Sequence, residues 1–398
     1  MQSLRMLYKI GKGPSSSHTM GPQYAAEYIN SNYPDAAFIK VILYGSLALT
    51  GEGHGTDKVL NETIKAPHRL ILDTTTSDLP HPNTLDFIIC DENENEIEKV
   101  RAMSIGGGEI RIEGVPAVTA PEVYPQKNFE EVKDYCLIHH LRLSDYVASY
   151  EGEGIMLFLK NVWEQMKMTV REGLNVEGIL PGGLEVERKA KYLYAQRHMD
   201  ETPETRENRL VCAYAYAASE QNAGGGTITT APTCGASSVL PAVLKYMQEK
   251  KRFSDEDILR ALAVGGLIGN IVKTNASVSG AECGCQAEIG SASAMAAGAL
   301  VHLQGGSNED ICCAVAISLK SLLGLTCDPI YGYVQIPCIE RNAVAAMRAI
   351  NAVNLASFLS ETRKISLDNV ITTMKKTGMD IHAAYRETSE GGLATLEI

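Results

Sequence analysis

The spacing of apolar residues changes near residue 127 and divides the chain into two parts. Before that point, runs of β-branched and aromatic residues alternate with Asn, Asp, Gly and Pro, a pattern typical of strands joined by turns. Strands are predicted in AFIKVILYGS, HRLILDTTT, TLDFIICDENENEIEKVRAMSIGGGEIRIEG and AVTAPEVYP, with a hairpin turn near Asn93. One segment, GPQYAAEYINSNY, has helical spacing instead, and Pro22 suits the first turn of that helix.

From residue 128 on, apolar residues recur at the 3.6-residue spacing of helices. Helices are predicted in NFEEVKDYCLIHHLRLSDYVASYEGEG, EGIMLFLKNVWEQMKMTVREGL, KAKYLYAQR, LVCAYAYAASEQNAGGG, SSVLPAVLKYMQEKKR, DEDILRALAVGGLIGNIVKTN, QAEIGSASAMAAGALVHLQGG, NEDICCAVAISLKSLLGL, ERNAVAAMRAINAVNLASFLS and SLDNVITTMKKTG. SNED and SLDN supply serine N-caps. We therefore predict an α+β fold, with a small N-terminal α/β domain over residues 1–127 and a larger all-helical domain over residues 128–398.

Composition narrows the class of protein. The formal net charge of −12 argues against a nucleic-acid-binding surface. The start MQSLRMLYKIGKG lacks the apolar core of a signal peptide, and ASAMAAGALVHL is too short to span a bilayer. We expect a soluble, cytoplasmic protein with no nucleic-acid or membrane partner. Ten cysteines, eight of them after residue 200, would then be reduced thiols available for metal binding, catalysis or plain burial.

The loop GPSSSHTMGP is a candidate anion site. Hydroxyls and backbone N–H groups before a helix can hold a carboxylate, because a helix N-terminus offers unpaired donors and a positive dipole end. Ser15, Ser16, Ser17 and Thr19 would supply the hydroxyls, with His18 as a donor or proton carrier. The alternative is an ordinary N-cap with surplus serines.

Two further polar segments could approach a ligand. In YGSLALTGEGHGTDK, predicted as a second polar turn, glycines surround His54 and would leave its imidazole accessible. In QNAGGGTITT, Asn222 and the glycines around Gly225 suit close contact with a small molecule. The alternatives are a merely solvated histidine and a flexible connection between helices.

Three cysteines lie at breaks in the helical pattern. Cys285 follows Gly284, Cys327 precedes Asp328-Pro329, and Cys338 follows Pro337. Three soft ligands of this kind fit zinc or an iron–sulfur cluster. Their spacing matches no short zinc or ferredoxin motif, so buried free cysteine remains an alternative. Cys283 stands two residues from Cys285, so its side chain should point in another direction.

Taken together, these segments resemble the iron–sulfur-dependent L-serine dehydratases (L-serine ammonia-lyases), single-chain form. The resemblance covers nearly the whole chain, in the order GPSSSHTMGP, YGSLALTGEGHGTDK, SIGGG, EGILPGGLEV, NAGGGTITTAPT, NASVSGAECGCQAEIGSA, GLTCDPIYGYVQIPCIERNA and YRETSEGGLA. It implies a [4Fe–4S] cluster held by Cys285, Cys327 and Cys338. Cys234 and Cys283 depart from the family pattern, which places an asparagine and a small apolar residue there.

The resemblance also implies a reaction, the dehydration of L-serine to pyruvate and ammonia, as in amino-acid catabolism and gluconeogenesis. The cluster would act as a Lewis acid on the hydroxyl. His54, or less favourably His18, would remove the α-proton, and the Ser15–Thr19 loop would hold the carboxylate, at an interface between the two domains. A homodimer is expected. The alternatives are the same chemistry on L-threonine or L-cysteine, a non-catalytic serine-binding protein, and a pyridoxal-phosphate enzyme using Lys273.

Overall fold

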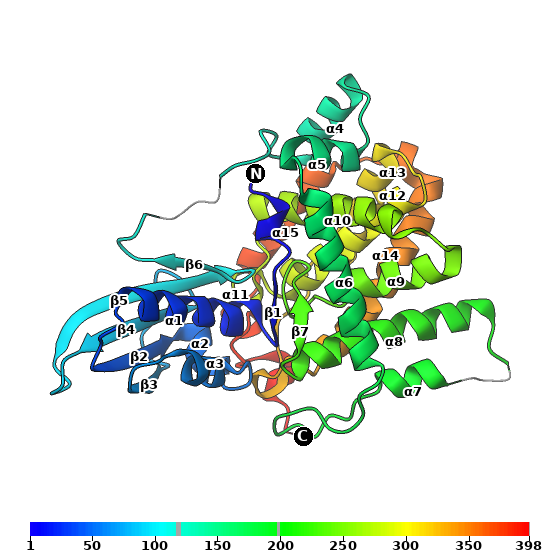
Figure 1. The fold of residues 1–398 in the computed structure, drawn as a ribbon. Helices are drawn as coiled ribbons and strands as arrows, with labels where there is room; N and C mark the ends of the chain where they lie inside the picture. The colour runs from blue at the N-terminus through cyan, green and yellow to red at the C-terminus, as the bar shows by residue number, and fades with distance from the viewer. Residues whose placement is uncertain (117–120, 197–199, 398) are drawn as a thin grey trace.

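A sheet domain lies beside a larger body of helices in the computed structural model, which describes residues 1–116, 121–196 and 200–397 (Figure 1). The sheet comes from the N-terminal part of the chain, and the helical body comes from the rest. This confirms the predicted α+β fold. The one strand described within the helical body is short, β7 (Thr227–Thr229), and it pairs antiparallel with β1 (Ile10–Lys12).

The sheet has five strands in the order β3-β2-β4-β5-β6, and the pairing of β2 with β3 is the parallel one. The antiparallel strands β4 and β5 form the predicted hairpin, with Glu94 at a φ of +60° in its turn. The bounds are β2 Phe38–Tyr44, β3 His68–Asp73, β4 Thr84–Cys90, β5 Glu96–Gly106 and β6 Glu109–Ile112. Of the predicted strand AVTAPEVYP, residues 117–120 lie outside the described residues, and the rest forms only a bridge between Gln2 and Glu122.

Three helices cover one face of this sheet: α1 (Gly21–Asn32), α2 (Gly45–Thr50) and α3 (Thr56–Thr63). Ile29 of α1 and Leu60 of α3 join a fully buried cluster with Val41 of β2 and Phe87 of β4. Alternate residues of a strand face the same side, so β2 and β4 present their most apolar face to the helices. The parallel step from β2 to β3 needs a crossover connection, and α2 and α3 supply it.

The helical body is built from helices predicted by their periodicity. Its longer members are α4 (Phe129–Ile138), α5 (Leu143–Glu151), α6 (Ile155–Gly173), α8 (Pro203–Ala223), α9 (Val239–Lys251), α10 (Asp255–Asn275), α12 (Ser291–Leu303), α13 (Asn308–Lys320), α14 (Cys338–Leu359) and α15 (Leu367–Asp380). Shorter helices and single turns are η1 (Leu4–Met6), η2 (Ser16–Met20), α7 (Ala190–Ala195), α11 (Gly280–Cys283), η3 (Gln286–Gly290), η4 (Ile330–Gly332), η5 (Ser360–Thr362), η6 (Ala383–Tyr385) and η7 (Gly392–Thr395). Ser307 and Ser366 cap α13 and α15 as predicted.

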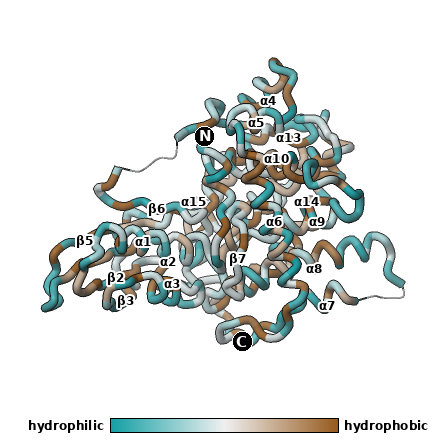
Figure 2. Tube along the Cα trace, viewed as in Figure 1, coloured by the Kyte–Doolittle hydropathy of each residue, from teal (hydrophilic) through white to brown (hydrophobic). Residues whose placement is uncertain are grey.

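The helix α12 is the centre of this body, because every one of its residues is buried. It packs against α9, α10, α13 and α14. Its small side chains allow this close approach: a Cβ on Gly298 would lie 3.1 Å from atoms of both Ile268 and Val315. The apolar stretch along α10 next to it is plain in Figure 2.

The first eight residues belong to the helical body although they precede the sheet domain. Met1, Leu4, Leu7 and Tyr8 are buried within the same apolar cluster as α10 and α12. The Tyr8 hydroxyl donates to the carbonyl of Leu262 at 2.9 Å. The chain therefore starts among the helices, pairs β1 with β7, and enters the sheet domain at the serine-rich loop.

One described helix, Cys338–Thr362, is long and apolar enough to be considered as a membrane span, but 44% of its apolar window is buried inside the protein. It comprises α14 and the following turn η5, and it packs against α8, α9, α12 and α13. These contacts make it part of the packing of the helical body.

Candidate active site

The serine-rich loop is buried at the start of α1. Its residues 16–20 form the wide turn η2, which runs directly into the helix. The Ser15 hydroxyl oxygen accepts a hydrogen bond from the backbone N–H of His18 (3.1 Å), and Thr19 Oγ1 accepts one from the N–H of Ser15 (3.1 Å). Of the hydroxyl residues in this loop, Ser15 lines a small buried cavity that His54 also lines, whereas Ser16, Ser17 and Thr19 do not line it.

His54 lies on the turn between α2 and α3. The sequence predicted one polar turn from residue 44 to 58, but both flanks are helical because Leu47 and Leu60 are buried against the sheet. Gly53 is needed where the turn meets the segment around η4: a Cβ there would lie 2.5 Å from the Tyr331 carbonyl oxygen. His54 is 2% exposed, so it is a buried group rather than a solvated one.

The two histidines predicted from separate segments lie face to face. Their ring centroids are 4.4 Å apart, with the ring planes inclined by 26°. Reciprocal bonds join the two turns: Thr19 Oγ1 donates to the His54 carbonyl (2.7 Å), and Thr56 Oγ1 donates to the His18 carbonyl (2.6 Å). Thr19 therefore positions the His54 turn.

Glu387, which the sequence did not single out, completes the histidine pair. Its Oε1 lies 3.3 Å from His54 Nε2 and 3.5 Å from His18 Nδ1. Burial opposes ionisation of this carboxyl, but the two imidazoles and the backbone amide of Ala281 hold its pKa below the usual value. A carboxylate is thus shared between two imidazoles in the interior.

The backbone of Glu387 is held in an unusual conformation. Its φ is +60°, a region that residues other than glycine rarely adopt. Its N–H donates to the carbonyl of Cys327 (2.8 Å), and its own carbonyl accepts from Ser46 Oγ (2.6 Å). These contacts join the C-terminal segment to the helical body on one side and to α2 on the other, and they fix the carboxylate between the two domains.

The hydrogen bonds of His54 leave one nitrogen free to accept a proton. Nδ1 lies 2.8 Å from the carbonyl oxygen of Thr50, which can only accept, so Nδ1 carries the hydrogen in the neutral ring. The lone pair is therefore on Nε2, beside Glu387. This is the arrangement of a general base whose protonated form is stabilised by a carboxylate.

His18 has both nitrogens engaged instead. The Ser46 hydroxyl donates its hydrogen to the Glu387 carbonyl, so it accepts from His18 Nε2 (3.0 Å), and Ser17 Oγ lies 2.9 Å from Nδ1. Burial lowers the pKa of His18 to about 4, and the charge of Glu387 only partly offsets this. A neutral His18 suits a supporting role beside His54.

Cys285, Cys327 and Cys338 converge on one cavity. Cys285 precedes η3, Cys327 lies in the loop before η4, and Cys338 is the first residue of α14. The ligand atoms of Cys285, Cys327 and Glu288 lie within 4.8 Å of one another. The cavity is lined by Pro14, Ser15, His54, Gly235, Cys285, Glu288, Ile289, Cys327, Pro329, Val334, Cys338 and Glu387. It thus joins the three thiols to His54, between the sheet domain and the helical body.

The groups around the thiols favour the thiolate form of Cys285. A hydrogen bond from Cys327 lowers the pKa of Cys285 against the effect of burial, and the Arg341 guanidinium acts in the same sense. Arg341 is itself anchored to Asp328 (2.9 Å). That same hydrogen bond, together with burial, raises the pKa of Cys327, and burial raises that of Cys338. The positive charge of Arg341 therefore acts on two of the three thiols, those of Cys285 and Cys338.

The other cysteines do not line this cavity. Cys283 points toward α15, where a Cβ on Gly378 would lie 2.7 Å from its sulfur. Cys234 packs against Met20, with the two sulfur atoms 3.4 Å apart. Burial raises the pKa of both thiols.

Asn222, Gly225 and Lys273 lie outside the cavity lining. Asn222 Nδ2 donates to the carbonyl of Pro14 (2.8 Å), so it supports the serine-rich loop from behind. Gly225 is exposed and has a φ of +75°, a conformation that favours glycine just after a helix. The backbone at the end of α8 therefore accounts for this glycine, and no ligand is needed to explain it. Lys273 pairs with Glu109 at 2.6 Å.

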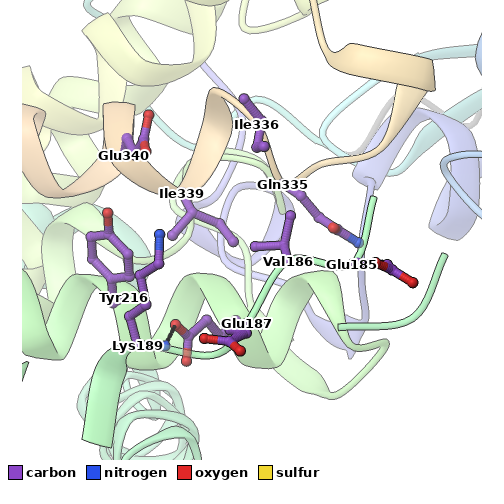
Figure 3. A pocket seen from close by; sticks show the side chains of 10 residues that line it. Glu185, Val186, Glu187, Lys189, Tyr216, Gln335, Ile336, Ile339 and Glu340 are labelled. Carbon is purple, nitrogen blue, oxygen red and sulfur yellow. Dashed lines mark hydrogen bonds between the residues drawn. The ribbon is translucent and has the colours of Figure 1, made fainter. Parts of the chain in front are cut away.

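A larger pocket, of about 310 Å³, lies beside the segment that leads into Cys338. Gln335, Ile336 and Ile339 line it, and Lys189 extends between Tyr216 and Ile339 (Figure 3). It contains none of the residues predicted to act in chemistry. The cavity with the thiols measures about 20 Å³, so ligand entry would require its side chains to separate. The grouping of reactive side chains, and not the volume, identifies the candidate site.

Known proteins are similar to this chain over nearly its whole length. The chain matches the family model described as serine dehydratase beta chain over residues 3–64 and the serine dehydratase alpha chain model over residues 88–394. It is 38% identical to the L-serine dehydratase of Haemophilus influenzae and to L-serine dehydratase 1 of Escherichia coli, over 99% of this chain and 99% of each relative. The chain belongs to the serine dehydratase family. The Streptomyces coelicolor L-serine dehydratase is also 38% identical, over 98% of this chain and 97% of that relative.

Several residues that line or support this candidate site were not predicted from the sequence. Glu387 lies in YRETSEGGLA, a segment that carried the resemblance but no assigned role. Glu288 stands three residues after Cys285, and Arg341 stands three residues after Cys338. On a helix this spacing makes two side chains neighbours, so it could have indicated both residues. Ser46 offered no local signal, because its partner Glu387 is 341 residues away along the chain.

Proposed function

We propose that the protein is an L-serine dehydratase that converts L-serine to pyruvate and ammonia with a [4Fe–4S] cluster bound by Cys285, Cys327 and Cys338. The observation that carries the proposal is the convergence of these three cysteines and His54 on one buried cavity. Membership of the serine dehydratase family and the printed names of the relatives support the choice of substrate.

The residues fit the proposed cluster. Three thiols are the soft donors that iron–sulfur clusters take, and they come from three rigid places in the helical body. Arg341 would offset part of the negative charge of the bound thiolates. When bound, such a cluster would supply an iron without a protein ligand, a Lewis acid that makes the serine hydroxyl a better leaving group.

His54 is the proposed base. Its Nε2 would take the proton from Cα, while Glu387 stabilises the imidazolium and Thr50 keeps the ring in place. The Cα–H electron pair forms the new double bond as the Cβ–O bond breaks. The departing hydroxide takes up a proton to become water, and His54 gives up the proton it took from Cα, so the net change is the loss of one water molecule. The resulting aminoacrylate tautomerises to an imine, which water hydrolyses to pyruvate and ammonia.

The serine-rich loop is the proposed site of the substrate carboxylate. Ser15 lines the cavity at the N-terminal end of η2 and α1, where the positive end of the helix dipole favours an anion. Ser17 and Thr19 act on the histidines rather than on the substrate. Asn222 holds the loop through the carbonyl of Pro14.

The setting we propose is a cytoplasmic homodimer that degrades L-serine and supplies pyruvate for gluconeogenesis. Phe358, with 83% of its surface exposed, and its neighbours Leu355 and Leu359 give the end of α14 an apolar surface that a second copy would cover. Light scattering during size-exclusion chromatography would test the dimer.

The test of the activity compares three amino acids. Protein purified without oxygen should form pyruvate from L-serine faster than it forms 2-oxobutyrate from L-threonine or pyruvate from L-cysteine. Turnover of L-threonine or L-cysteine above that of L-serine would replace the substrate. Saturable L-serine binding without any turnover would make the protein a binder.

A further inference from the structure

The carboxylate of Glu387 has one oxygen that the histidines do not use. Oε1 lies near both imidazoles, and the backbone amide of Ala281 acts on the carboxylate, but Oε2 makes no hydrogen bond of normal distance and angle among the described residues. The side chain is 4% exposed, so water does not readily satisfy this atom. A buried carboxylate oxygen without a partner is costly, and a ligand that donates a hydrogen bond to it would remove that cost.

The lining of the cavity indicates what that donor is. Its acidic residues are Glu288 and Glu387, and no lysine or arginine is among its lining residues. Glu288 lies on the thiol side, 3.9 Å from Cys285 Sγ. Glu387 lies on the histidine side, next to His54 Nε2. A cationic group beside the base would therefore meet Glu387 first.

We propose that Glu387 Oε2 binds the α-ammonium group of the substrate while Oε1 lies beside His54 Nε2, where it stabilises the ring once Nε2 is protonated. This inference rests on the proposed function. It makes Glu387 the residue that selects an amino acid over a hydroxy acid or a simple carboxylic acid. The ammonium and the reacting hydrogen share the same carbon atom. One carboxylate bound to both the ammonium and the base thus directs the Cα–H bond toward Nε2.

Two ligands that differ only in the ammonium group test this assignment. L-Alanine and propionate have the same three-carbon skeleton and carboxylate, and neither has a hydroxyl to lose. Isothermal titration calorimetry on anaerobically purified protein would measure both affinities without turnover. The variant is Glu387→Gln, and the matched control is Glu390→Gln, the same charge change at an exposed position three residues later.

The wild type and Glu390→Gln should bind L-alanine more tightly than propionate. In Glu387→Gln, the L-alanine affinity should fall about 10- to 100-fold, the range for a lost hydrogen bond to a charged group, while propionate binding stays unchanged. Glu387→Asp keeps the charge and should retain part of the preference. An equal loss for both ligands would indicate a merely structural role and overturn the assignment, as would an unchanged preference for L-alanine.

This outcome is separable from a failure of the proposed function. If wild-type protein binds L-alanine through Glu387 but forms no pyruvate from L-serine, the reaction is wrong and the ammonium site stands. If wild-type protein forms pyruvate while Glu387→Gln keeps its preference, the ammonium site is wrong and the reaction stands. Iron content and the midpoint of thermal unfolding, measured for each variant, identify a variant that has lost its cluster or its fold.

Discussion

His54→Gln should lower kcat for L-serine by about 10² to 10⁴, the usual effect of removing a general base. This corresponds to about 2.7–5.5 kcal/mol in the activation free energy. The structure gives the reason: Nε2 holds the ring's free lone pair because Nδ1–H is bound to Thr50, and an amide cannot replace it as a base. Since KM reflects binding at other groups, it should change little.

The assay follows pyruvate formation without oxygen, with His18→Gln as the matched control. His18 has the same ring and the same burial, but its nitrogens are engaged by Ser46 and Ser17. His18→Gln should lower kcat less than His54→Gln does. It should lower the free energy of unfolding more, because it breaks two buried hydrogen bonds. Exchange of the serine α-proton with deuterated water, if reversible in the wild type, should be lost only in His54→Gln. Wild-type exchange in His54→Gln together with lost exchange in His18→Gln would refute the choice of base.

Three further predictions follow from other parts of the structure. Serine in place of any one of the three cavity cysteines should abolish both iron binding and activity, whereas Cys283→Ala should keep both; iron analysis decides. Gly298→Val should lower the free energy of unfolding by about 1–3 kcal/mol in urea titrations, because its side chain would overlap Ile268 and Val315; an unchanged midpoint would contradict the packing described for α12. Burial lowers the pKa of His302 to about 4, so the unfolded chain binds more protons and stability is lost as the pH falls from about 6.5 toward 4. Between pH 7 and pH 5, the free energy of unfolding should therefore fall by about 2 kcal/mol less in His302→Gln than in the wild type. Equal falls in the two proteins would contradict a neutral His302.

The helical body could be predicted from sequence because its signals are local. Helices such as α10 and α15 show both a regular apolar spacing and a serine cap, and each of these needs only a few neighbouring residues. The two helices around His54 were missed for the same reason. Residues 45–50 and 56–63 are too short to show a period, and the glycines between them favour a turn.

The site could be predicted only in part. The thiols and histidines were predicted because their types and their positions at breaks suggest chemistry, although nothing in their spacing shows that they meet. Glu387 was not found, because its role depends on contacts with Cys327, Ser46 and the two histidines, all distant in sequence. Substrate binding by Ser17 and Thr19 stays a prediction, and in the fold their hydroxyls contact His18 and the His54 turn.

The most direct test of the central proposal is iron and acid-labile sulfide, measured per chain on the same anaerobic preparation whose L-serine turnover is known. A [4Fe–4S] cluster at this site gives about four of each per active chain. Activity should rise in proportion to the cluster content across preparations and disappear when the iron is removed by a chelator. Full pyruvate formation by protein that contains no iron would contradict it.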